Sequence, residues 1–276
     1  MLDSRNGEIE MKIVILMGSP RKQDSLNVCK EIESRLGTKD ITYDYIFLKD
    51  YEIQDCRGCG LCFSKSENLC PCKDDLSIIR KRLIEADGIV FATPVYAYQV
   101  PAPIKRIIDR MSFLFHRQEL VGKPVLVVVT SDGGGHKQVS KYIKMTVSGW
   151  ACNLIGTINI ISPMYFKDKK DNSAWGYSES YHNKISLRIK KLSHKFKVSI
   201  ESKVTKNPSF YELFMFNCLR TKTFTFQADY DFWNEKGWLN SYYFYDTKLN
   251  TFKKIFANIL RIIINLAGQR LKNKIS

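Results

Sequence analysis

The chain has 276 residues, of which 44% are hydrophobic and 26% are charged, and its formal net charge is +15. These values are ordinary for a globular protein and exclude a fibrous, low-complexity or largely disordered chain. No stretch reaches the roughly 18 uninterrupted apolar residues of a membrane-spanning helix, and the polar first ten residues do not resemble a secretory signal, so a cytoplasmic location is expected.

Short apolar runs alternate with segments of helical periodicity as far as residue 161. This alternation predicts a parallel sheet covered on both faces and joined by right-handed crossovers. Five strands at this spacing match a doubly wound, flavodoxin-like α/β fold with strand order 2-1-3-4-5. The predicted strands are 12–17, 42–48, 88–92, 124–130 and 154–161, and the predicted helices are 25–36, 76–84, 103–115 and 137–150.

The loop between the first strand and the first helix has the chemistry of a phosphate site. It reads Gly-Ser-Pro-Arg-Lys-Gln-Asp-Ser over residues 18–25. A helix N-terminus offers backbone N–H groups and a favourable dipole, while Ser19 and Ser25 add hydroxyls and Arg21 adds a guanidinium. The alternative is an ordinary polar turn. The loop lacks the glycine pattern of dinucleotide folds and the Gly-Lys-Ser/Thr ending of nucleoside triphosphate sites, so neither ligand is favoured.

The opening of the chain resembles the NADPH-dependent FMN reductase family of flavodoxin-like proteins. The resemblance rests on Met-Lys-Ile-Val-Ile-Leu-Met-Gly-Ser-Pro-Arg-Lys at 11–22, and on Thr-Pro-Val-Tyr at 93–96 followed by a helix from Pro103. It implies FMN, with its phosphate on loop 18–25 and its isoalloxazine ring against loops 93–98 and 131–136, and NAD(P)H as a transient co-substrate. The segment after Lys22 is one residue longer than is usual in the family, which leaves open the phosphate contacts among the following polar residues. The expected FMN-site residues are Ser19, Arg21, Gln23, Ser25, Asn27, Pro94, Val95, Tyr96, Ala97, Ser131, Gly133 and Gly134.

The two later loops suit a flat ring on chemical grounds as well. Tyr96 and Tyr98 can flank such a ring, and the glycines of loop 131–136 can bring backbone N–H groups close to its edge. For His136 two interpretations stay open, a proton donor beside the ring and a solvated loop histidine.

Five of the eight cysteines lie between residues 56 and 72. In a reducing compartment such a concentration indicates metal or redox chemistry rather than disulfides. Two-residue spacers allow a turning backbone to aim successive thiolates at one centre, and four thiolates suit a [4Fe–4S] cluster or a zinc ion. Thiols without metal are the third alternative. The remaining Cys29, Cys152 and Cys218 lie in apolar segments and are expected in the core.

The cysteine segment resembles that of iron–sulfur flavoproteins, a branch of the same family. The resemblance implies cluster ligation by Cys56, Cys59, Cys62 and Cys70. It favours Cys70 over Cys72 because two aspartates follow Cys70 at the spacing associated with that branch. It also implies a cluster placed near a flavin across a subunit boundary, and hence a homo-oligomer.

After residue 164 the alternation stops. Segment 167–173 is a polar linker, 178–204 a basic helix, and 249–266 an amphipathic basic helix. Residues 180–276 hold 18 Lys and Arg against six Asp and Glu, so +12 of the total +15 lies there. We therefore expect a flavodoxin-like domain at 11–165, with the cysteine insert at 56–72, and a mainly helical, aromatic-rich extension at 166–276.

The surfaces of this extension have several possible roles. The apolar stripe of helix 249–266 suits packing on its own domain or on a partner subunit better than contact with an anionic membrane. No nucleic-acid motif accompanies the positive charge, so no nucleic-acid partner is expected. Trp233, Trp238 and the run 242–245 are interpreted as the core of a small subdomain, a lid over the flavin, or a dimer surface.

These expectations combine into one functional prediction with two rivals. The chain is predicted to pass electrons between a one-electron or NAD(P)H donor and a small-molecule or protein acceptor, through FMN and a [4Fe–4S] cluster. The rivals are a cluster-free NAD(P)H-dependent FMN or quinone reductase and a non-catalytic flavin electron carrier.

Overall fold

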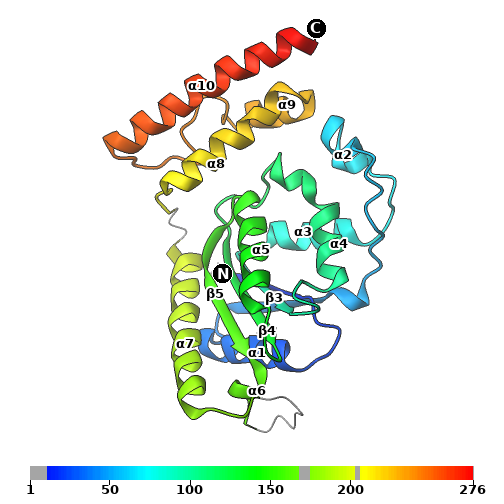
Figure 1. Ribbon diagram of the computed structural model, residues 1–276, viewed down its shortest axis with the longest axis vertical. Coiled ribbons are helices and arrows are strands. Elements are labelled where there is room, and N and C mark those ends of the chain that lie inside the picture. Colours follow the sequence, from blue (N-terminus) through cyan, green and yellow to red (C-terminus); the bar gives the residue numbers. More distant parts are fainter. Residues whose placement is uncertain (1–10, 168–174, 203–205, 276) are drawn as a thin grey trace, which may run out of the picture.

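The computed structural model describes residues 11–167, 175–202 and 206–275 (Figure 1). Its five strands form one parallel sheet in the order β2-β1-β3-β4-β5, which confirms the predicted flavodoxin-like topology. The strands are β1 (Met11–Met17), β2 (Ile41–Phe47), β3 (Gly88–Pro94), β4 (Pro124–Ser131) and β5 (Asn153–Ile161).

Helices connect the strands and continue beyond the last one. They are α1 (Asp24–Leu36), α2 (Leu61–Ser64), α3 (Leu76–Glu85), α4 (Ala102–Arg110), α5 (His136–Gly149), α6 (Ser162–Tyr165), α7 (Glu179–Ser202), α8 (Phe210–Arg220), α9 (Gln227–Glu235) and α10 (Thr251–Ile275), with 3-10 turns η1 (Leu48–Asp50), η2 (Glu67–Leu69), η3 (Ser112–Phe115) and η4 (Thr221–Phe224). The predicted helix 103–115 is split at Met111, because the tighter η3 turn keeps the consecutive side chains of Phe113 and Leu114 buried. Most of the predicted linker 167–173, and the end of the predicted helix 178–204, lie outside the described residues.

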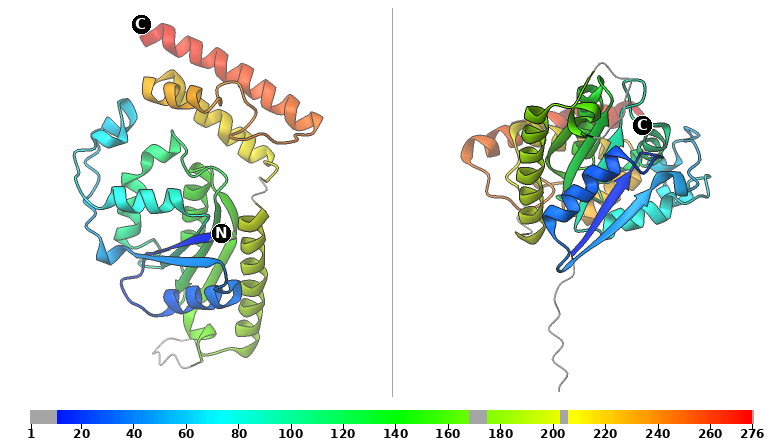
Figure 2. Two further views of the ribbon diagram at one scale, coloured as in Figure 1. Left: turned by 180° about the vertical axis from the view of Figure 1, so that it is seen from behind. Right: turned by 90° about the horizontal axis from the view of Figure 1, so that it is seen from below.

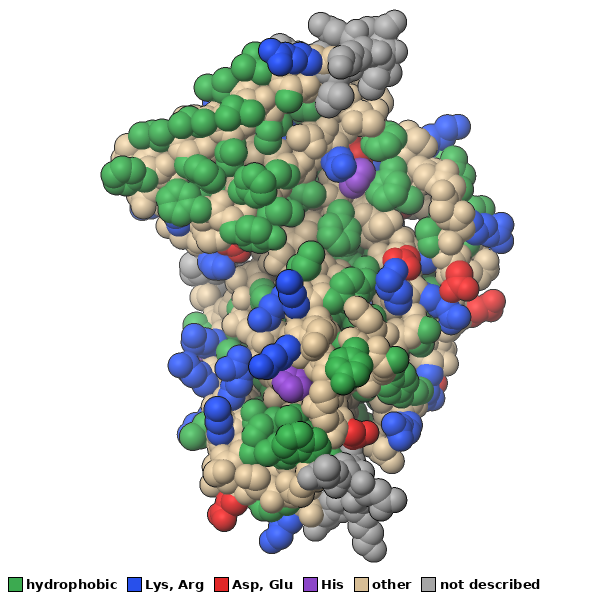
Figure 3. Space-filling model, viewed as in Figure 1, with side chains coloured by type: hydrophobic (Ala, Val, Ile, Leu, Met, Phe, Trp, Pro, Cys, Tyr) green, Lys and Arg blue, Asp and Glu red, His purple; other side chains and the backbone are tan. Residues whose placement is uncertain are grey.

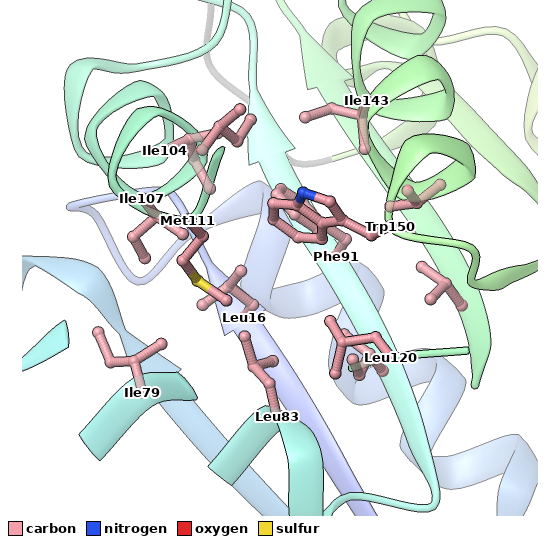
Figure 4. Packing of buried hydrophobic residues seen from close by; sticks show 14 of the residues in the cluster. Leu16, Ile79, Leu83, Phe91, Ile104, Ile107, Met111, Leu120, Ile143 and Trp150 are labelled. Atoms are coloured by element: carbon pink, nitrogen blue, oxygen red, sulfur yellow. The ribbon is translucent and has the colours of Figure 1, made fainter. Parts of the chain in front are cut away.

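One face of the sheet is covered by α3, α4 and α5. Alternate strand residues such as Leu16 and Phe91 meet Ile79, Ile104 and Ile143 from the three helices, as Figure 4 shows. Strands buried on both faces explain the continuous apolar runs of β1, β3 and β4.

The opposite face is covered by α1 and by α7, a helix that the sequence assigned to the extension. Ile189 and Phe196 of α7 are completely buried in the same cluster as Ile13 and Ile15 of β1. Glycine permits this close approach, since a Cβ added at Gly88 would lie 2.6 Å from Ile200 Cδ1. The domain boundary stays a prediction, and this packing leads us to propose it after α7 rather than at residue 165.

Helices α8, α9 and α10 form a separate lobe around a group of aromatic rings. Trp233 is fully buried at its centre, with Phe216 stacked against it and Phe244 in an edge-to-face contact. The interpretation of these aromatics as subdomain core is confirmed, since Trp233, Trp238, Tyr243 and Phe244 are buried in one cluster. Figures 1 and 2 place the lobe at the end of the molecule opposite α6.

Two smaller expectations can be compared with the structure. Cys29 and Cys152 are buried as predicted, and burial raises the pKa of the Cys152 thiol to about 12, whereas Cys218 is only half-buried. Over the described ranges, no helix is both long enough and apolar enough to cross a membrane.

Candidate functional site

A cavity of about 640 Å³ opens at the carboxyl ends of the sheet strands, where a doubly wound fold places its ligand. It is formed by the loop after β1, the start of α1, the ends of β3 and β4, and α6. Nine of the twelve residues predicted for the FMN site line it: Ser19, Arg21, Gln23, Ser25, Asn27, Pro94, Val95, Tyr96 and Ser131. Their contact with FMN stays a prediction.

The loop after β1 presents the start of α1 to this cavity. Ser19 Oγ donates to the carbonyl of Arg21 at 2.8 Å and curls the loop back on itself. Ser25 Oγ pairs with Thr130 Oγ1 at 2.7 Å, which ties the first turn of α1 to β4. The exposed guanidinium of Arg21 lies at the cavity, so a cation and a helix N-terminus face the same space.

The second predicted loop turns sharply beside the cavity. Tyr96 and Gln99 exchange two backbone hydrogen bonds of 2.8 Å, and Ala97 and Tyr98 between them have φ of 46° and 62°. Both residues adopt the left-handed backbone conformation although neither is glycine. For a non-glycine residue this conformation costs about 1–3 kcal/mol. Tyr96 lines the cavity, whereas Ala97 does not.

The glycines of the third loop make a contact that the sequence did not predict, while their contact with FMN stays a prediction. A Cβ at Gly134 would lie 3.3 Å from the Tyr98 hydroxyl, and one at Gly135 only 2.7 Å from Val95 Cγ1. These glycines let the second loop pack on the third, and Gly133 and Gly134 do not line the cavity.

His136 does not line the cavity either. It starts α5 half-buried, and its Nδ1 is buried with no hydrogen-bond partner among the described residues. This environment does not match a solvated loop residue, and the role of a ring-side proton donor stays a prediction.

The cavity also includes residues that sequence reasoning missed. They are Asp24, Thr130, Asp132, Ser162, Phe166 and Lys167. Ser162 is 1% exposed, and its hydroxyl finds no partner in the described part of the chain. Its only sequence signal is its position directly after the fifth predicted strand, at the same sheet edge as the three loops.

These residues fit FMN. A volume of this size suits a cofactor of several hundred Å³. The cation and helix start suit an anionic phosphate, and the unpaired Ser162 hydroxyl suits a polar chain. Val95, Tyr96 and Phe166 supply apolar surface for a flat ring.

A second cavity, of about 450 Å³, lies between the cysteine loop, α3 and the end of α4. All five clustered cysteines line it: Cys56, Cys59, Cys62, Cys70 and Cys72. Gly58 and Gly60 have φ of 65° and 71°, which lets the loop turn between consecutive thiols. Burial raises the pKa of the Cys62 thiol, and the nearby thiols of Cys56 and Cys70 raise it further.

The thiols surround one space without forming a coordination site. In the residues that the structure describes, no group of three or more His, Cys, Asp or Glu side chains is arranged to hold a metal ion. The donor set nevertheless fits a four-thiolate centre, since five cysteines without disulfide partners line the same cavity.

Two buried arginines, Arg110 and Arg117, hydrogen-bond to the cysteine loop. The Arg110 guanidinium pairs with Asp74 at 2.5 Å and donates to Cys70 Sγ at 3.6 Å. Both side chains of that pair are 2% exposed or less. Arg117 donates to the carbonyl oxygen of Cys62.

The two cavities share no lining residue. Ser162 of α6 lines the first, whereas the second is lined by residues of the cysteine loop, α2, α3 and α4. One chain therefore keeps the two candidate centres apart.

The chain is similar in sequence to one known family and to several curated proteins. The family of NADPH-dependent FMN reductases matches residues 11–166. An iron–sulfur flavoprotein of Archaeoglobus fulgidus is 29% identical over 240 residues, covering 83% of this chain and 100% of that protein. An iron–sulfur flavoprotein of Methanocaldococcus jannaschii is 35% identical over 128 residues, covering 45% of this chain and 65% of that protein.

Solved structures show the same fold. RosB with a bound 8-demethyl-8-formylriboflavin-5'-phosphate intermediate superposes with a TM-score of 0.53 at 14% identity, covering 87% of this chain and 92% of that one. An oxidoreductase of Corynebacterium diphtheriae superposes with a TM-score of 0.52 at 13% identity, over 71% of this chain and 100% of that one. The chain belongs to the NADPH-dependent FMN reductase family of flavin oxidoreductases, in the branch whose relatives are named iron–sulfur flavoproteins.

Proposed function

We propose that the cavity at the carboxyl ends of the strands holds FMN and that the chain oxidises NAD(P)H or a one-electron donor and reduces a separate acceptor. The observation that carries this proposal is the convergence of a helix N-terminus, Arg21 and the unpaired, buried Ser162 hydroxyl on one cavity. Bound FMN supplies the ability to take electrons in pairs or singly. Family membership supports the cofactor.

In this proposal the chain contacts FMN at its phosphate and at its ring. Arg21 and the first turn of α1 hold the phosphate, where the guanidinium and the helix dipole both favour negative charge. Phe166 and Tyr96 exclude water from the ring. Ser162 donates to a ligand oxygen and so satisfies its own buried hydroxyl.

Arg21→Ala tests the phosphate contact. Loss of one charged donor is expected to weaken FMN binding by about 1.5–3 kcal/mol, or roughly 10- to 150-fold in dissociation constant. Lys22→Ala is the matched control, because the Lys22 ammonium lies 4.9 Å from the Phe47 ring centroid and does not line the cavity. Equal dissociation constants for wild type and Arg21→Ala would remove the phosphate role from this loop.

We further propose that Cys56, Cys59, Cys62 and Cys70 bind a [4Fe–4S] cluster, which passes electrons singly. The shared cavity and the names of the relatives support this assignment. The rival is a cluster-free NAD(P)H-dependent reductase, and the observation in its favour is the open arrangement of the described thiols. Iron and labile sulfide in anaerobically purified protein distinguish the two.

We also propose that the chain assembles with a second copy through α10. Its side chains Phe252, Ile255, Ile259, Ile262 and Leu266 are each more than half exposed. Their three- and four-residue steps form a single seam with the spacing of a coiled coil. Figure 3 shows apolar side chains in a row along α10.

The seam faces away from the lobe and has one uncharged flank. Ala257 and Gly268, which pack against the lobe, lie on the opposite side of the helix, since each residue turns it by about 100°. Beside the seam stand Thr251, Asn258 and Asn265 on one flank. An acidic partner helix would be matched by basic flanking residues, whereas an uncharged flank lets two strongly basic copies approach along that side.

Ile259→Asp should convert the assembled protein to a monomer, as measured by light scattering at micromolar concentration. Lys254→Asp places the same residue on α10 away from the seam and should leave the mass unchanged. A monomeric wild type would refute the assembly. An assembly that survives Ile259→Asp would place its interface elsewhere.

A further inference from the structure

The C-terminal lobe reaches the cysteine loop through one buried carboxylate. Asp229 of α9 is 0% exposed. One of its oxygens accepts a hydrogen bond from Arg117 Nη1, and the other lies 2.7 Å from His116 Nδ1. Both partners come from the segment after η3, which belongs to the flavodoxin-like part of the chain.

Arg117 continues the connection into the cysteine loop. Its side chain is 6% exposed, and its Nη2 donates both to the carbonyl oxygen of Cys62 and to Glu67 Oε2, the latter at 3.1 Å. Glu67 is held in turn by Arg80 at 2.9 Å. One guanidinium therefore joins Asp229 in the lobe to the backbone of a cysteine at the pocket.

A group of aromatic rings makes a second, apolar contact at the same place. Phe63 follows Cys62 in the chain, and its ring lies 4.4 Å from the His116 ring and 6.4 Å from the Phe226 ring, centroid to centroid. Phe226 immediately precedes α9. Cys62 is thus connected to the lobe in two ways. Its carbonyl oxygen accepts a hydrogen bond from Arg117, which pairs with Asp229, and the ring of the next residue, Phe63, packs near Phe226.

We propose that the C-terminal lobe is a positioning element for the cysteine pocket, with Asp229 acting through Arg117 to hold Cys62 in place. The inference rests on the proposed cluster site and assigns a role to α9, which lies outside the part of the chain that the family matches. A fixed ligand loop loses less conformational freedom when it binds its metal centre, so the centre is retained longer. Removing one member of a buried ion pair leaves the charge of the other uncompensated. The position of Arg117, and with it the hold on Cys62, therefore depends on Asp229.

The test compares Asp229→Asn with Asp231→Asn in the full chain loaded with FMN. Asp231 lies on the same helix, is exposed, and accepts a hydrogen bond from Gln227 at 2.7 Å. The first measurement is the rate at which N-ethylmaleimide labels Cys62 in protein without a cluster, resolved by peptide mass spectrometry. We expect about tenfold faster labelling or more in Asp229→Asn, because breaking a buried pair is strongly unfavourable.

The second measurement uses protein reconstituted with iron and sulfide. Asp229→Asn is expected to release iron to a chelator about tenfold faster and to shift the midpoint potential of the cluster upward, since a nearby negative charge is lost. A role confined to the lobe core would leave the rate of iron release unchanged. Asp231→Asn should match wild type in each measurement.

A Cys62 labelling rate and an iron release rate that are unchanged in Asp229→Asn would overturn the inference. If wild type binds no iron, the cluster proposal fails. The labelling rate of Cys62 still tests whether Asp229 holds Cys62 in place. If Asp229→Asn loses FMN and fold, Phe226→Ala takes its place, because it removes the half-buried ring against Phe63 and leaves the ion pair intact. If Phe226→Ala labels Cys62 at least about threefold faster than wild type, the role of the lobe in positioning Cys62 is supported. An unchanged labelling rate rejects that role.

Discussion

At the scale of single residues, Ser162 provides the sharpest test of the flavin cavity. Its hydroxyl is buried at the cavity and lacks a partner in the described chain. A buried polar group without a partner is unfavourable, so Ser162→Ala should leave the unfolding free energy of the FMN-free protein unchanged or slightly raised. FMN binding should weaken by about 1 kcal/mol, or roughly fivefold. Equilibrium titration with FMN checks this.

Ser193 of α7 offers a matched control. It is also 1% exposed and also lacks a hydroxyl partner among the described residues, but it does not line the cavity. Ser193→Ala should have the same small effect on unfolding and none on FMN affinity. Equal FMN affinity in the two variants would show that Ser162 makes no ligand contact.

Most of the cavity could be predicted from the sequence because three of its loops carry recognisable residues after apolar runs. Ser162 could not, since it follows β5 without any motif. Gly133 and Gly134 were expected at a ring edge because glycine allows close approach, but sequence alone does not say what approaches. In the structure that neighbour is the side chain of Tyr98 or Trp175.

Cys70 and Cys72 differ in what surrounds their sulfur atoms. Cys70 Sγ is half-buried and accepts from Arg110 at 3.6 Å, whereas Cys72 is buried and its Sγ donates to the Asp55 carbonyl at 3.6 Å. Cys70→Ser should therefore abolish bound iron while FMN stays, and Cys72→Ser should retain iron. Iron analysis beside the FMN spectrum checks both. The reverse outcome would make Cys72 the fourth ligand.

At the scale of elements, α7 is an integral cover of the sheet. Gly88→Val places new methyl groups where Ile200 and Phe196 now lie, and overpacking of this kind costs about 1–3 kcal/mol of unfolding free energy. Ile200→Ala combined with Gly88→Val should recover part of that loss. Urea denaturation measures each variant.

The exposed neighbourhood of Gly176 supplies the control. A Cβ there meets nothing within 4 Å, so Gly176→Val should change stability by less than about 0.5 kcal/mol. A Gly88→Val protein as stable as wild type would mean that α7 does not pack on β3 as described.

The existence of α7 was predictable, but its place was not. Its apolar side chains recur at three- and four-residue steps, while its many lysines suggested a separate basic extension. The structure reconciles the two, because Ile185, Ile189 and Phe196 face the sheet and the lysines line the other side. Truncation after residue 164 would therefore uncover the sheet as well as remove the lobe.

At the scale of the whole molecule, buried ion pairs make stability depend on acid pH. Burial tends to raise the pKa of Asp74, but hydrogen bonds from Arg110 and from the backbone of Gln54 and Leu76 hold that pKa below its ordinary value. Arg82 likewise lowers the pKa of Asp44. These carboxylates therefore bind protons less readily in the folded chain than in the unfolded one.

Their stabilising effect is complete above the unfolded pKa of about 4 and is lost as the pH falls through the lower folded values. Asp74→Asn should lower stability by about 3 kcal/mol at pH 7 and flatten the fall in stability between about pH 4 and 2. Asp55→Asn, with an 80% exposed side chain, is the control and should keep the wild-type profile. If the stability of Asp74→Asn falls between about pH 4 and 2 as steeply as that of wild type, the role of the Arg110–Asp74 pair is contradicted.

The arrangement of the whole chain separates the two candidate centres. The flavin cavity lies at the carboxyl ends of the strands, and the cysteine cavity lies beside α3 and α4 with the lobe next to it. An α10 pair would join copies at the lobe, so it does not by itself bring one cysteine cavity to another flavin cavity. Electron transfer between the centres of different copies would require a second contact surface.

The measurement that tests the central claim most directly is the FMN, iron and sulfide content of the anaerobically purified full chain, read with its visible spectrum. The proposed function predicts one FMN per chain, with about four iron and four sulfide for each FMN. FMN without iron, before and after reconstitution, would leave a cluster-free flavin reductase. A folded chain that holds neither FMN nor iron at micromolar concentration would contradict the account.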